Sequence, residues 1–324
     1  MSNASLFASI DLGGTNIECA LGTGEGRIVC AEKVRTRSEE GPHPVLERIS
    51  GLAQRLARDA GQPLEAVSMG LPGLLDLERG TAKFLPNFPG HWQDVPVRDM
   101  LSATIGCPVY LLNDVRMATL GELTFGHGRG SQTMAFFALG TGIGGGLVID
   151  GRLRLGPLGA AGELGHQTIV PDGPRCGCGN RGCLEALASG PALASEGVRL
   201  MLSGQAPKLR ERVLGEASSV TPQEMAAAAE SGDEAVRHAI IRAAEYLGIA
   251  VANVITILHP DLVVLGGGVA AIGPLLFETV RRTVRRRVGM LPTDDVEIKP
   301  SLLGDRAGIM GGLALAAEGG LIRK

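Results

Sequence analysis

The chain has 324 residues, of which 44% are hydrophobic and 20% charged, and its formal net charge is −3. This composition is typical of a soluble globular protein with room for two lobes, and it excludes a general nucleic-acid or membrane-surface binder. The chain opens without a signal peptide pattern and has no apolar run of the ~18 residues that a membrane span needs, so we expect a cytoplasmic protein.

The first third of the chain alternates strand and helix patterns. A buried strand ends at a glycine turn, and two more strands follow in a meander. A helix with a regular apolar face comes next, followed by two strand–helix pairs. We expect strands at 6–10, 17–21, 28–34, 67–71 and 109–112, and helices at 44–60, 97–105 and 117–125. This order predicts a mixed sheet with helices on its faces.

A second unit begins near Gly130 and opens in the same way, with strand, glycine turn and strand. The repeated opening hints at a duplicated topology. No Pro- or Ser-rich linker separates the units, so we expect them to share a hinge. We expect strands at 134–139, 147–150 and 262–265, and helices at 193–202, 222–229, 234–258, from about 274, and at 307–317.

The most informative segment is a cysteine-rich loop in the middle of the chain. One histidine and three cysteines there form a complete ligand set for a tetrahedral zinc ion: His166, Cys176, Cys178 and Cys183. In a reducing compartment thiols favour a metal over disulfides. Glu163 and Glu185 bracket the loop and are not needed to hold the metal. These spare carboxylates predict that a polar ligand is held at the loop.

Two glycine turns predict a phosphate site. In each turn a strand ends at glycines accompanied by a threonine, and exposed N–H groups with a hydroxyl can wrap phosphate oxygens without a lysine. Asp11 adds a carboxylate suited to a water-bridged Mg²⁺. The expected contacts are Asp11, Gly13, Gly14, Thr15, Asn16, Gly140, Thr141 and Gly142, with Gly266, Gly267 and Gly268 allowing close approach of a base.

The second turn, 140–146, also matches the G-x-G-x-x-G fingerprint of dinucleotide-binding folds. That fingerprint needs a helix directly after the glycines, whereas here β-branched residues and a turn at Asp150 and Gly151 predict a hairpin. No glycine turn continues into the Gly-Lys-Ser or Gly-Lys-Thr of a P-loop. We therefore favour a nucleoside triphosphate clasped by both turns over two hairpins without a ligand.

Phosphoryl transfer to an alcohol needs a metal, in-line placement and a group that takes the hydroxyl proton. Asn113 and Asp114 follow a strand, at the edge where α/β sheets bind ligands, although such a pair also serves as a helix cap. We interpret Asp114 as the base and Asn113 as the residue that orients the acceptor. The expected acceptor site is rich in carboxylates and amides, as a sugar requires: Asn87, Asn113, Asp114, Glu163, His166 and Glu185.

These motifs resemble the ROK family of sugar kinases and repressors, in the hexokinase–actin ATPase superfamily. The most specific part is Glu163-x-x-His166 followed by Cys176-x-Cys178-x4-Cys183-x-Glu185, and further stretches are similar to those of bacterial glucokinases. The resemblance implies an α/β, two-lobed, actin-like (ribonuclease H-like) fold in which mixed sheets are flanked by helices and a zinc loop is added. Its smaller lobe would be 1–122 with 305–324, and its larger lobe 123–304.

The resemblance further implies ATP-dependent phosphorylation of the 6-hydroxyl of glucose, with Mg²⁺ on the nucleotide, a structural zinc and a homodimer. It implies that Asp114 is the base, that Glu163, His166 and Glu185 touch sugar hydroxyls, and that 266–268 belong to the adenosine pocket. Three departures from the family pattern stand out. Relative to that pattern, His91 is an insertion before Trp92, on the segment that carries Asn87. Asn16 stands where many relatives have lysine, and Arg116, close to the acceptor edge, leaves the identity of the sugar open.

Several alternatives remain. N-acetylglucosamine, N-acetylmannosamine, mannose or fructose can replace glucose, and polyphosphate can replace ATP. A sugar-sensing repressor of the same family needs a helix-turn-helix before the first phosphate strand, which here begins near Leu6. A non-catalytic sugar binder is the third alternative, although Asp11, Thr15, Asp114 and Thr141 are all present. Nucleic acid and membrane are not expected partners.

Overall fold

The fold is described from a computed structural model, which places residues 5–86, 88–89 and 92–320. The chain forms two compact units. Residues 1–130, 153–161 and 302–324 make the first unit, and residues 131–152 and 162–301 make the second. The first unit thus includes a short segment, 153–161, from the middle of the chain, which we call the excursion. Its 3₁₀ turn at Pro157–Gly159 packs on strand β5 (Leu74–Asp76) of the first unit.

The buried carboxyl of Glu122 holds two backbone segments of the first unit. Its Oε2 accepts a hydrogen bond from the N–H of His127 at 3.2 Å, and its Oε1 accepts one from the N–H of Leu303 at 2.9 Å. Glu122 thereby holds a backbone segment that precedes the second unit in the sequence and one that follows it, and both belong to the first unit.

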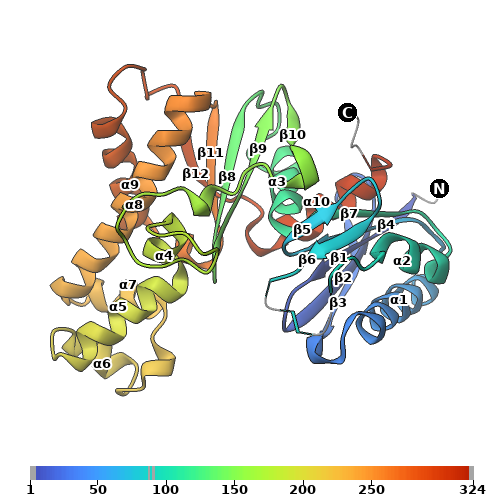
Figure 1. Ribbon diagram of the computed structural model, residues 1–324, viewed down its shortest axis with the longest axis horizontal. Helices are drawn as coiled ribbons and strands as arrows, with labels where there is room; N and C mark the ends of the chain where they lie inside the picture. The colour runs from blue at the N-terminus through green and yellow to red at the C-terminus, as the bar shows by residue number, and fades with distance from the viewer. Residues whose placement is uncertain (1–4, 87, 90–91, 321–324) are drawn as a thin grey trace. The chain divides into compact units, whose positions relative to one another are not determined.

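The first unit is built on a five-stranded sheet with the order β3-β2-β1-β4-β7 (Figure 1). β1 pairs antiparallel with β2 and parallel with β4, and β4 pairs parallel with β7. The strands are β1 (Leu6–Leu12), β2 (Asn16–Gly22), β3 (Ile28–Arg35), β4 (Leu64–Leu71) and β7 (Val109–Asn113). A hairpin of β5 and β6 (Thr81–Phe84), which was not predicted, follows β4.

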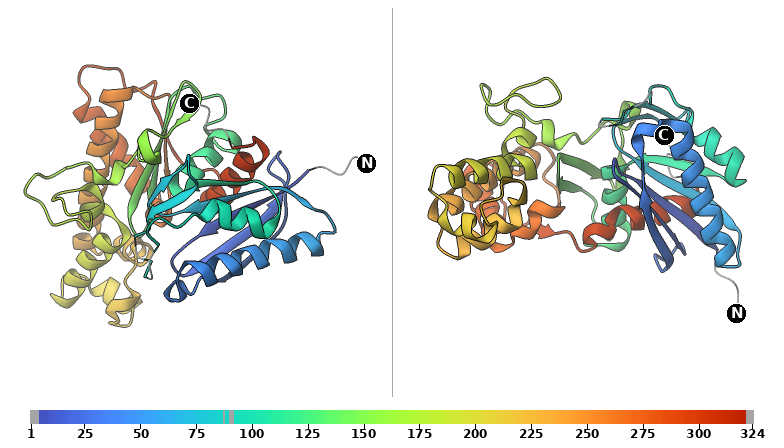
Figure 2. Two further views of the ribbon diagram at one scale, coloured as in Figure 1. Left: turned by 45° about the vertical axis from the view of Figure 1, so that its right-hand side comes forward. Right: turned by 90° about the horizontal axis from the view of Figure 1, so that it is seen from below.

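Helices cover both faces of this sheet (Figures 1 and 2). Side chains alternate along β1, so Ile10 joins the core beneath α1 while Phe7 packs with Leu313 of α10 on the other face. Four helices make up the two layers: α1 (Pro42–Asp59), α2 (Val97–Ile105), α3 (Asp114–Phe125) and α10 (Ala307–Ala317).

The helices α3 and α10 cross at glycines. A Cβ on Gly311 would lie 1.7 Å from the carbonyl oxygen of Met117, and a Cβ on Gly121 would lie 2.2 Å from that of Ala307. Any larger residue would force the two backbones apart. The crossing therefore holds α3 in a fixed place, and Asp114 is the first residue of that helix.

We expect Gly311→Ala to lower the free energy of unfolding by about 1–3 kcal/mol or more, because the added methyl overpacks against backbone that cannot move aside. The matched control is Gly308→Ala in the same helix, where a Cβ has nothing within 4 Å. The control should be neutral or slightly stabilising, since alanine favours helix. Denaturant unfolding of both variants checks this, and equal effects would contradict the close crossing.

The second unit repeats the sheet of the first, with the order β10-β9-β8-β11-β12. β8 pairs antiparallel with β9 and parallel with β11, and β11 pairs parallel with β12. The duplicated topology at which the sequence hinted is confirmed. The strands are β8 (Met134–Leu139), β9 (Ile143–Ile149), β10 (Arg152–Arg154), β11 (Leu262–Gly266) and β12 (Glu297–Pro300).

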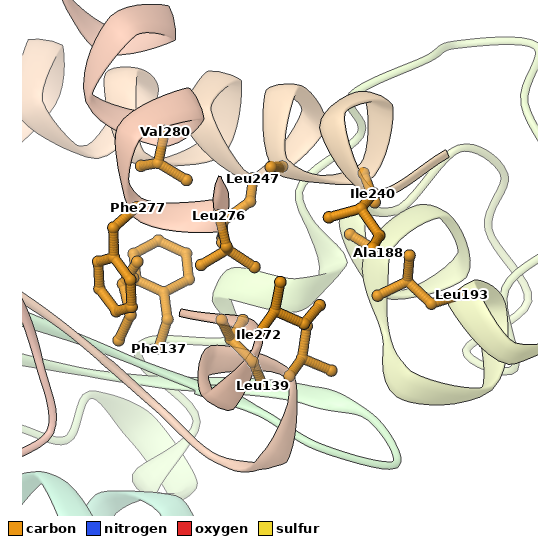
Figure 3. Packing of buried hydrophobic residues seen from close by; sticks show 14 of the residues in the cluster. Phe137, Leu139, Ala188, Leu193, Ile240, Leu247, Ile272, Leu276, Phe277 and Val280 are labelled. Atoms are coloured by element: carbon orange, nitrogen blue, oxygen red, sulfur yellow. The ribbon is translucent and has the colours of Figure 1, made fainter. Parts of the chain in front are cut away.

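The core of the second unit lies between this sheet and its helices (Figure 3). Phe137 of β8 packs with Phe277 and Val280 of α9, and Ile240 of α8 extends the same cluster. α8 is long and apolar enough to cross a membrane by length and composition, but 56% of that window is buried, as in the core helix of a soluble protein. The helices are α4 (Leu184–Ala188), α5 (Gly190–Leu202), α6 (Pro207–Arg212), α7 (Pro222–Glu230), α8 (Glu234–Leu258) and α9 (Pro274–Arg287).

Candidate functional site

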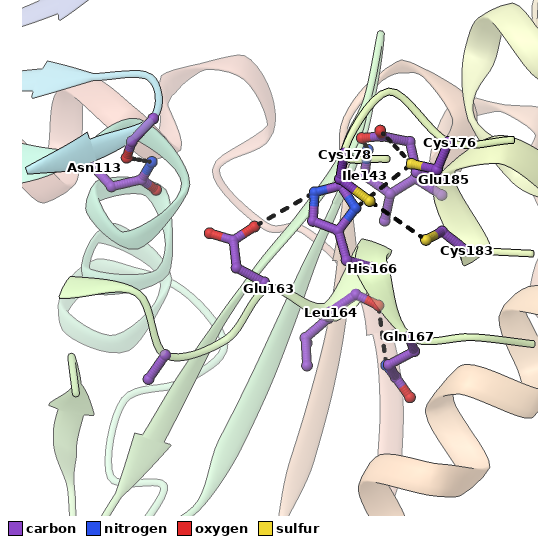
Figure 4. A network of polar contacts seen from close by, with 12 residues as sticks. Asn113, Ile143, Glu163, Leu164, His166, Gln167, Cys176, Cys178, Cys183 and Glu185 are labelled. Atoms are coloured by element: carbon purple, nitrogen blue, oxygen red, sulfur yellow. Dashed lines mark hydrogen bonds and ion pairs between the residues drawn. The ribbon is translucent and has the colours of Figure 1, made fainter. Parts of the chain in front are cut away.

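Four side chains of the second unit converge as the sequence predicts: His166, Cys176, Cys178 and Cys183 (Figure 4). Their ligand atoms all lie within 4.8 Å of one another. The sulfur atoms of Cys178 and Cys183 are 3.7 Å apart, and His166 Nδ1 lies 3.7 Å from the sulfur of Cys176. A tetrahedron with zinc–sulfur bonds of ~2.3 Å has edges of about 3.8 Å, so these residues fit a zinc ion.

The orientation of His166 divides its two ring nitrogens between two partners. Nδ1 faces the thiols, whereas Nε2 lies 3.9 Å from a carboxylate oxygen of Glu163. A metal bound at Nδ1 would leave the ring proton on Nε2. The His166 and Glu163 side chains remain 33% and 41% exposed, so a ligand can reach them. An N–H donor beside a carboxylate acceptor suits a ligand that carries hydroxyl groups.

The three thiols of the cluster differ in the direction in which their pKa values are shifted. Burial raises the pKa of Cys176 to about 12 and also raises that of Cys183. A hydrogen bond from the backbone of Asn180 lowers the pKa of Cys178. Burial therefore favours the thiol form of Cys176 and Cys183, and a bound metal, which favours thiolates, would release protons.

Glu185 connects the cysteine loop with the second glycine turn. One of its oxygens accepts a hydrogen bond from the N–H of Ile143 at 2.9 Å, and the other lies 3.5 Å from the sulfur of Cys176. A Cβ on Gly142 would lie 2.5 Å from the first oxygen, so glycine at 142 makes room for this contact. Glu185 thus ties the turn to the loop, a role that the sequence did not reveal.

The second glycine turn is shorter than the expected 140–146, because β9 already begins at Ile143. Gly144, Gly145 and Gly146 pair with β8 inside the sheet. A Cβ on Gly145 would lie 2.5 Å from the side chain of Leu164, so this glycine allows close packing of the loop on the strand. Only Gly140, Thr141 and Gly142 form the turn, and Thr141 is exposed at its tip.

The first glycine turn closes between β1 and β2 of the first unit. The N–H of Gly13 donates to the carbonyl of Asn16 at 3.0 Å, and the hydroxyl of Thr36 donates to the carbonyl of Gly13 at 2.6 Å. Gly14 and Thr15 are exposed at the tip. This arrangement leaves the N–H groups and the hydroxyl of the tip able to meet a phosphate group.

Asp11 and Asp114 lie together at the carboxyl ends of β1 and β7. Both adjoin Gly70 of β4, where a Cβ would lie 3.5 Å from Asp114 Cα and 3.8 Å from Asp11 Oδ1. Burial, with the nearby carboxylates of Asp114 and Glu18, raises the pKa of Asp11 from 3.8 to about 6. The pair therefore concentrates negative charge at one sheet edge, as a site for a bound cation requires.

The raised pKa of Asp11 makes a prediction about stability. The unfolded chain ionises Asp11 near 3.8 and the folded chain near 6, so folding is progressively disfavoured as the pH rises between these values. About two pKa units correspond to roughly 3 kcal/mol. Without nucleotide or Mg²⁺, Asp11→Asn should therefore melt at a higher temperature than the wild type at pH 8, and this difference should shrink towards pH 4. Asp99→Asn, which changes an exposed carboxylate, serves as the control.

Asn113 caps α3 and thereby fixes the start of the helix that carries Asp114. Its Oδ1 accepts hydrogen bonds from the N–H groups of Val115 at 3.1 Å and Arg116 at 3.3 Å, and its Nδ2 donates to the carbonyl of Gly73 at 3.2 Å. The structure thus shows the helix cap, which leaves Asp114 in the first turn of α3. The helix begins at Asp114, three residues before the predicted start at Met117.

The predicted sugar contact Asn87 lies outside the described residues. The glycines predicted to border a base, 266–268, lie at the end of β11. Gly266 ends β11 and is buried, with a Cβ position 3.0 Å from the ring of Phe136, whereas Gly267 and Gly268 are exposed. Gly267 has a φ of +84°, and a Cβ there would lie 2.5 Å from the carbonyl oxygen of Leu139.

Comparisons with known proteins cover almost the whole chain. The sequence model of the ROK family matches residues 7–319. A glucokinase from Thermotoga maritima is 36% identical over 95% of this chain and 96% of its own length. A xylose repressor from Caldicellulosiruptor bescii is 32% identical over 94% of this chain and 76% of its own length.

The solved structures agree with the sequence comparisons. The crystal structure of a ROK family glucokinase from Streptomyces griseus, in complex with glucose and AMPPNP, matches with a TM-score of 0.83 and 32% identity, over 97% of this chain and all of that one. The mixed sheets flanked by helices are those of the actin-like ATPase fold. On its sequence and its fold, the chain belongs to the ROK family.

Proposed function

We propose that this protein transfers the γ-phosphoryl group of ATP to the 6-hydroxyl of glucose. It is a sugar kinase, since glucokinases are among its relatives over nearly the full length of both chains. The observation that carries the proposal within this chain is the placement of Asp114 beside Asp11 at one sheet edge, on a helix whose first turn is capped by Asn113.

In this proposal Asp114 accepts the proton of the sugar hydroxyl while the hydroxyl oxygen attacks the γ-phosphorus, and ADP leaves on the opposite side. The tips of the two glycine turns, 13–16 and 140–142, hold phosphate oxygens through their N–H groups. Asp11 would hold Mg²⁺ through water, and the cation would supply charge neutralisation on the phosphates. The exposed glycines 267 and 268 border the base of the nucleotide.

The sugar is held by side chains of the cysteine loop. Glu163 and Glu185 accept hydrogen bonds from hydroxyl groups, and the Nε2 proton of His166 donates one. Asn87 and Asn113 complete the contacts. A zinc ion on His166, Cys176, Cys178 and Cys183 would hold the loop in shape, and four protein ligands leave it no open position for chemistry. We further propose a cytoplasmic homodimer.

The test is a coupled assay with the purified protein, across a panel of hexoses and with ATP, GTP and polyphosphate as donors. We expect the highest kcat/KM with glucose and ATP. Robust activity on an N-acetylhexosamine, mannose or fructose with none on glucose would refute the sugar assignment. A protein that binds sugar and DNA without transferring phosphate would refute the enzyme and favour the repressor class among its relatives.

A further inference from the structure

Arg116 is a charged side chain with almost no contact with solvent. It is the third residue of α3 and is 1% exposed. A guanidinium group can be buried only if its N–H groups find acceptors. Nε and Nη2 donate to the carbonyl oxygen of Ala161 at 3.1 and 2.8 Å, and Nη1 donates to Oδ1 of Asn113 at 3.1 Å. One planar group therefore joins two places that are 48 residues apart in the chain.

The contact with Asn113 decides how its amide is oriented. Oδ1 already accepts from the N–H groups of Val115 and Arg116, and Arg116 Nη1 is its third donor. Nδ2 uses one proton on the carbonyl of Gly73. The amide oxygen is thus saturated, and Asn113 can offer a ligand an N–H donor but no acceptor.

The contact with Ala161 fixes the end of the excursion 153–161. The N–H of Ala161 donates to the carbonyl of Leu155 at 2.8 Å, and its carbonyl receives both Arg116 bonds, so this peptide is held from both sides. Glu163 follows two residues later and begins the loop that carries His166. Ala161 is therefore the anchored residue from which the chain continues into that loop.

We propose that Arg116 is a positioning residue for the sugar: its guanidinium sets the donor of Asn113 and the starting point of the loop that carries Glu163. The inference rests on the proposed function. Because Arg116 is buried, it acts on the sugar through its hydrogen-bond partners and not by direct contact. The fork shape is essential, since a lysine ammonium has a single nitrogen and cannot serve both acceptors in this plane.

The kinetic test compares Arg116→Lys and Arg116→Met with the wild type. We expect the KM for the sugar to rise at least tenfold in both variants and the KM for ATP to change less than twofold. Loss of active protein alone would lower kcat and leave both KM values unchanged. A wild-type KM for the sugar in Arg116→Lys would overturn the proposal, because a positive charge alone would then position the sugar without the forked guanidinium.

Arg98→Lys is the matched control. Arg98 also donates to two backbone carbonyls, those of Leu77 and Glu78 at 3.3 and 2.9 Å, within the same unit. Its replacement should leave the KM for the sugar unchanged. A rise equal to that of the Arg116 variants would mean that any such anchor in the unit has the same effect, which would overturn the specific role.

Hydrogen exchange of the protein without substrates separates this proposal from the proposed function. Arg116→Lys should speed exchange of the Ala161 amide at least tenfold, with little change in the strands β1 and β4. This result would stand even if the sugar were not glucose or the protein were not a kinase. Unchanged exchange at Ala161 would refute the anchor itself. If Arg116→Met fails to fold, a double-mutant cycle of Arg116→Lys and Asn113→Ser replaces it. We expect the effects of the two substitutions on the KM for the sugar to be coupled. Additive effects would refute the proposal.

Discussion

Asp114→Asn is expected to lower kcat by about 10³-fold and to leave sugar binding nearly intact. General-base catalysis contributes about 10²–10⁴-fold, and asparagine keeps the shape of the side chain but cannot accept the proton. The first turn of α3 should survive, because its cap is formed by Asn113. Turnover is measured in a coupled assay, and sugar binding by the fluorescence of Trp92, the single tryptophan of the chain.

Asp99→Asn is the control for this prediction, since Asp99 is an exposed carboxylate on α2 of the same unit. It should retain wild-type kcat. If Asp114→Asn kept kcat within tenfold of the wild type, the proton would have to go elsewhere and Asp114 would lose its assignment as the base. If it lost sugar binding together with turnover, its role would be in binding.

Removal of the proposed zinc is the second change with a large expected effect. Structural zinc in small sites contributes about 10–16 kcal/mol of binding free energy, and the loop has little other reason to bring three thiols together. We expect Cys178→Ser or chelation to raise the KM for the sugar more than 100-fold. The melting temperature should fall by about 5 °C or more, since a loss of ~3 kcal/mol alone shifts a chain of this size by about that much. Metal analysis should find one zinc per chain in the wild type.

Two glycines of the loop provide a matched pair for this prediction. A Cβ on Gly182 would lie 1.6 Å from the carbonyl oxygen of Val170, whereas a Cβ on Gly177 has nothing within 4 Å. Gly182→Ala should therefore lose zinc and sugar affinity together, and Gly177→Ala should keep both. A metal-free wild-type protein with full activity would contradict the zinc assignment.

Local patterns in the sequence predicted the regular elements well. The bounds of α8 and α10 are those expected, because long apolar periodicity is a property of the segment itself. Short edge strands such as β10 and β12 have no such pattern and were missed. The strand β9 was placed too late, since three consecutive glycines suggest a turn, whereas here they pair within the sheet and Gly145 allows the packing of Leu164 on the strand.

The sequence predicted those parts of the candidate site whose residues lie close together along the chain. The cysteines lie close in sequence, so their convergence followed from spacing alone. Arg116 shows the limit: its place close to the acceptor edge left the identity of the sugar open, and nothing in the sequence indicated that it is buried against Ala161, 45 residues away. The choice of Nδ1 of His166 as the nitrogen that faces the thiols likewise depends on tertiary structure.

The shared strand order of the two sheets has a consequence for the history of the molecule. The turn at 13–16 and the turn at 140–142 occupy equivalent places, between the first and second strands of each sheet. The connection from third to fourth strand differs greatly: it is the single long helix α1 in one unit, and the cysteine loop with α4–α8 in the other. A gene doubling accounts for the repeated strand order, and a longer connection in one copy accounts for the cysteine loop. Under the proposed function, the connection that carries the sugar contacts can therefore change without altering the two turns proposed to hold phosphate.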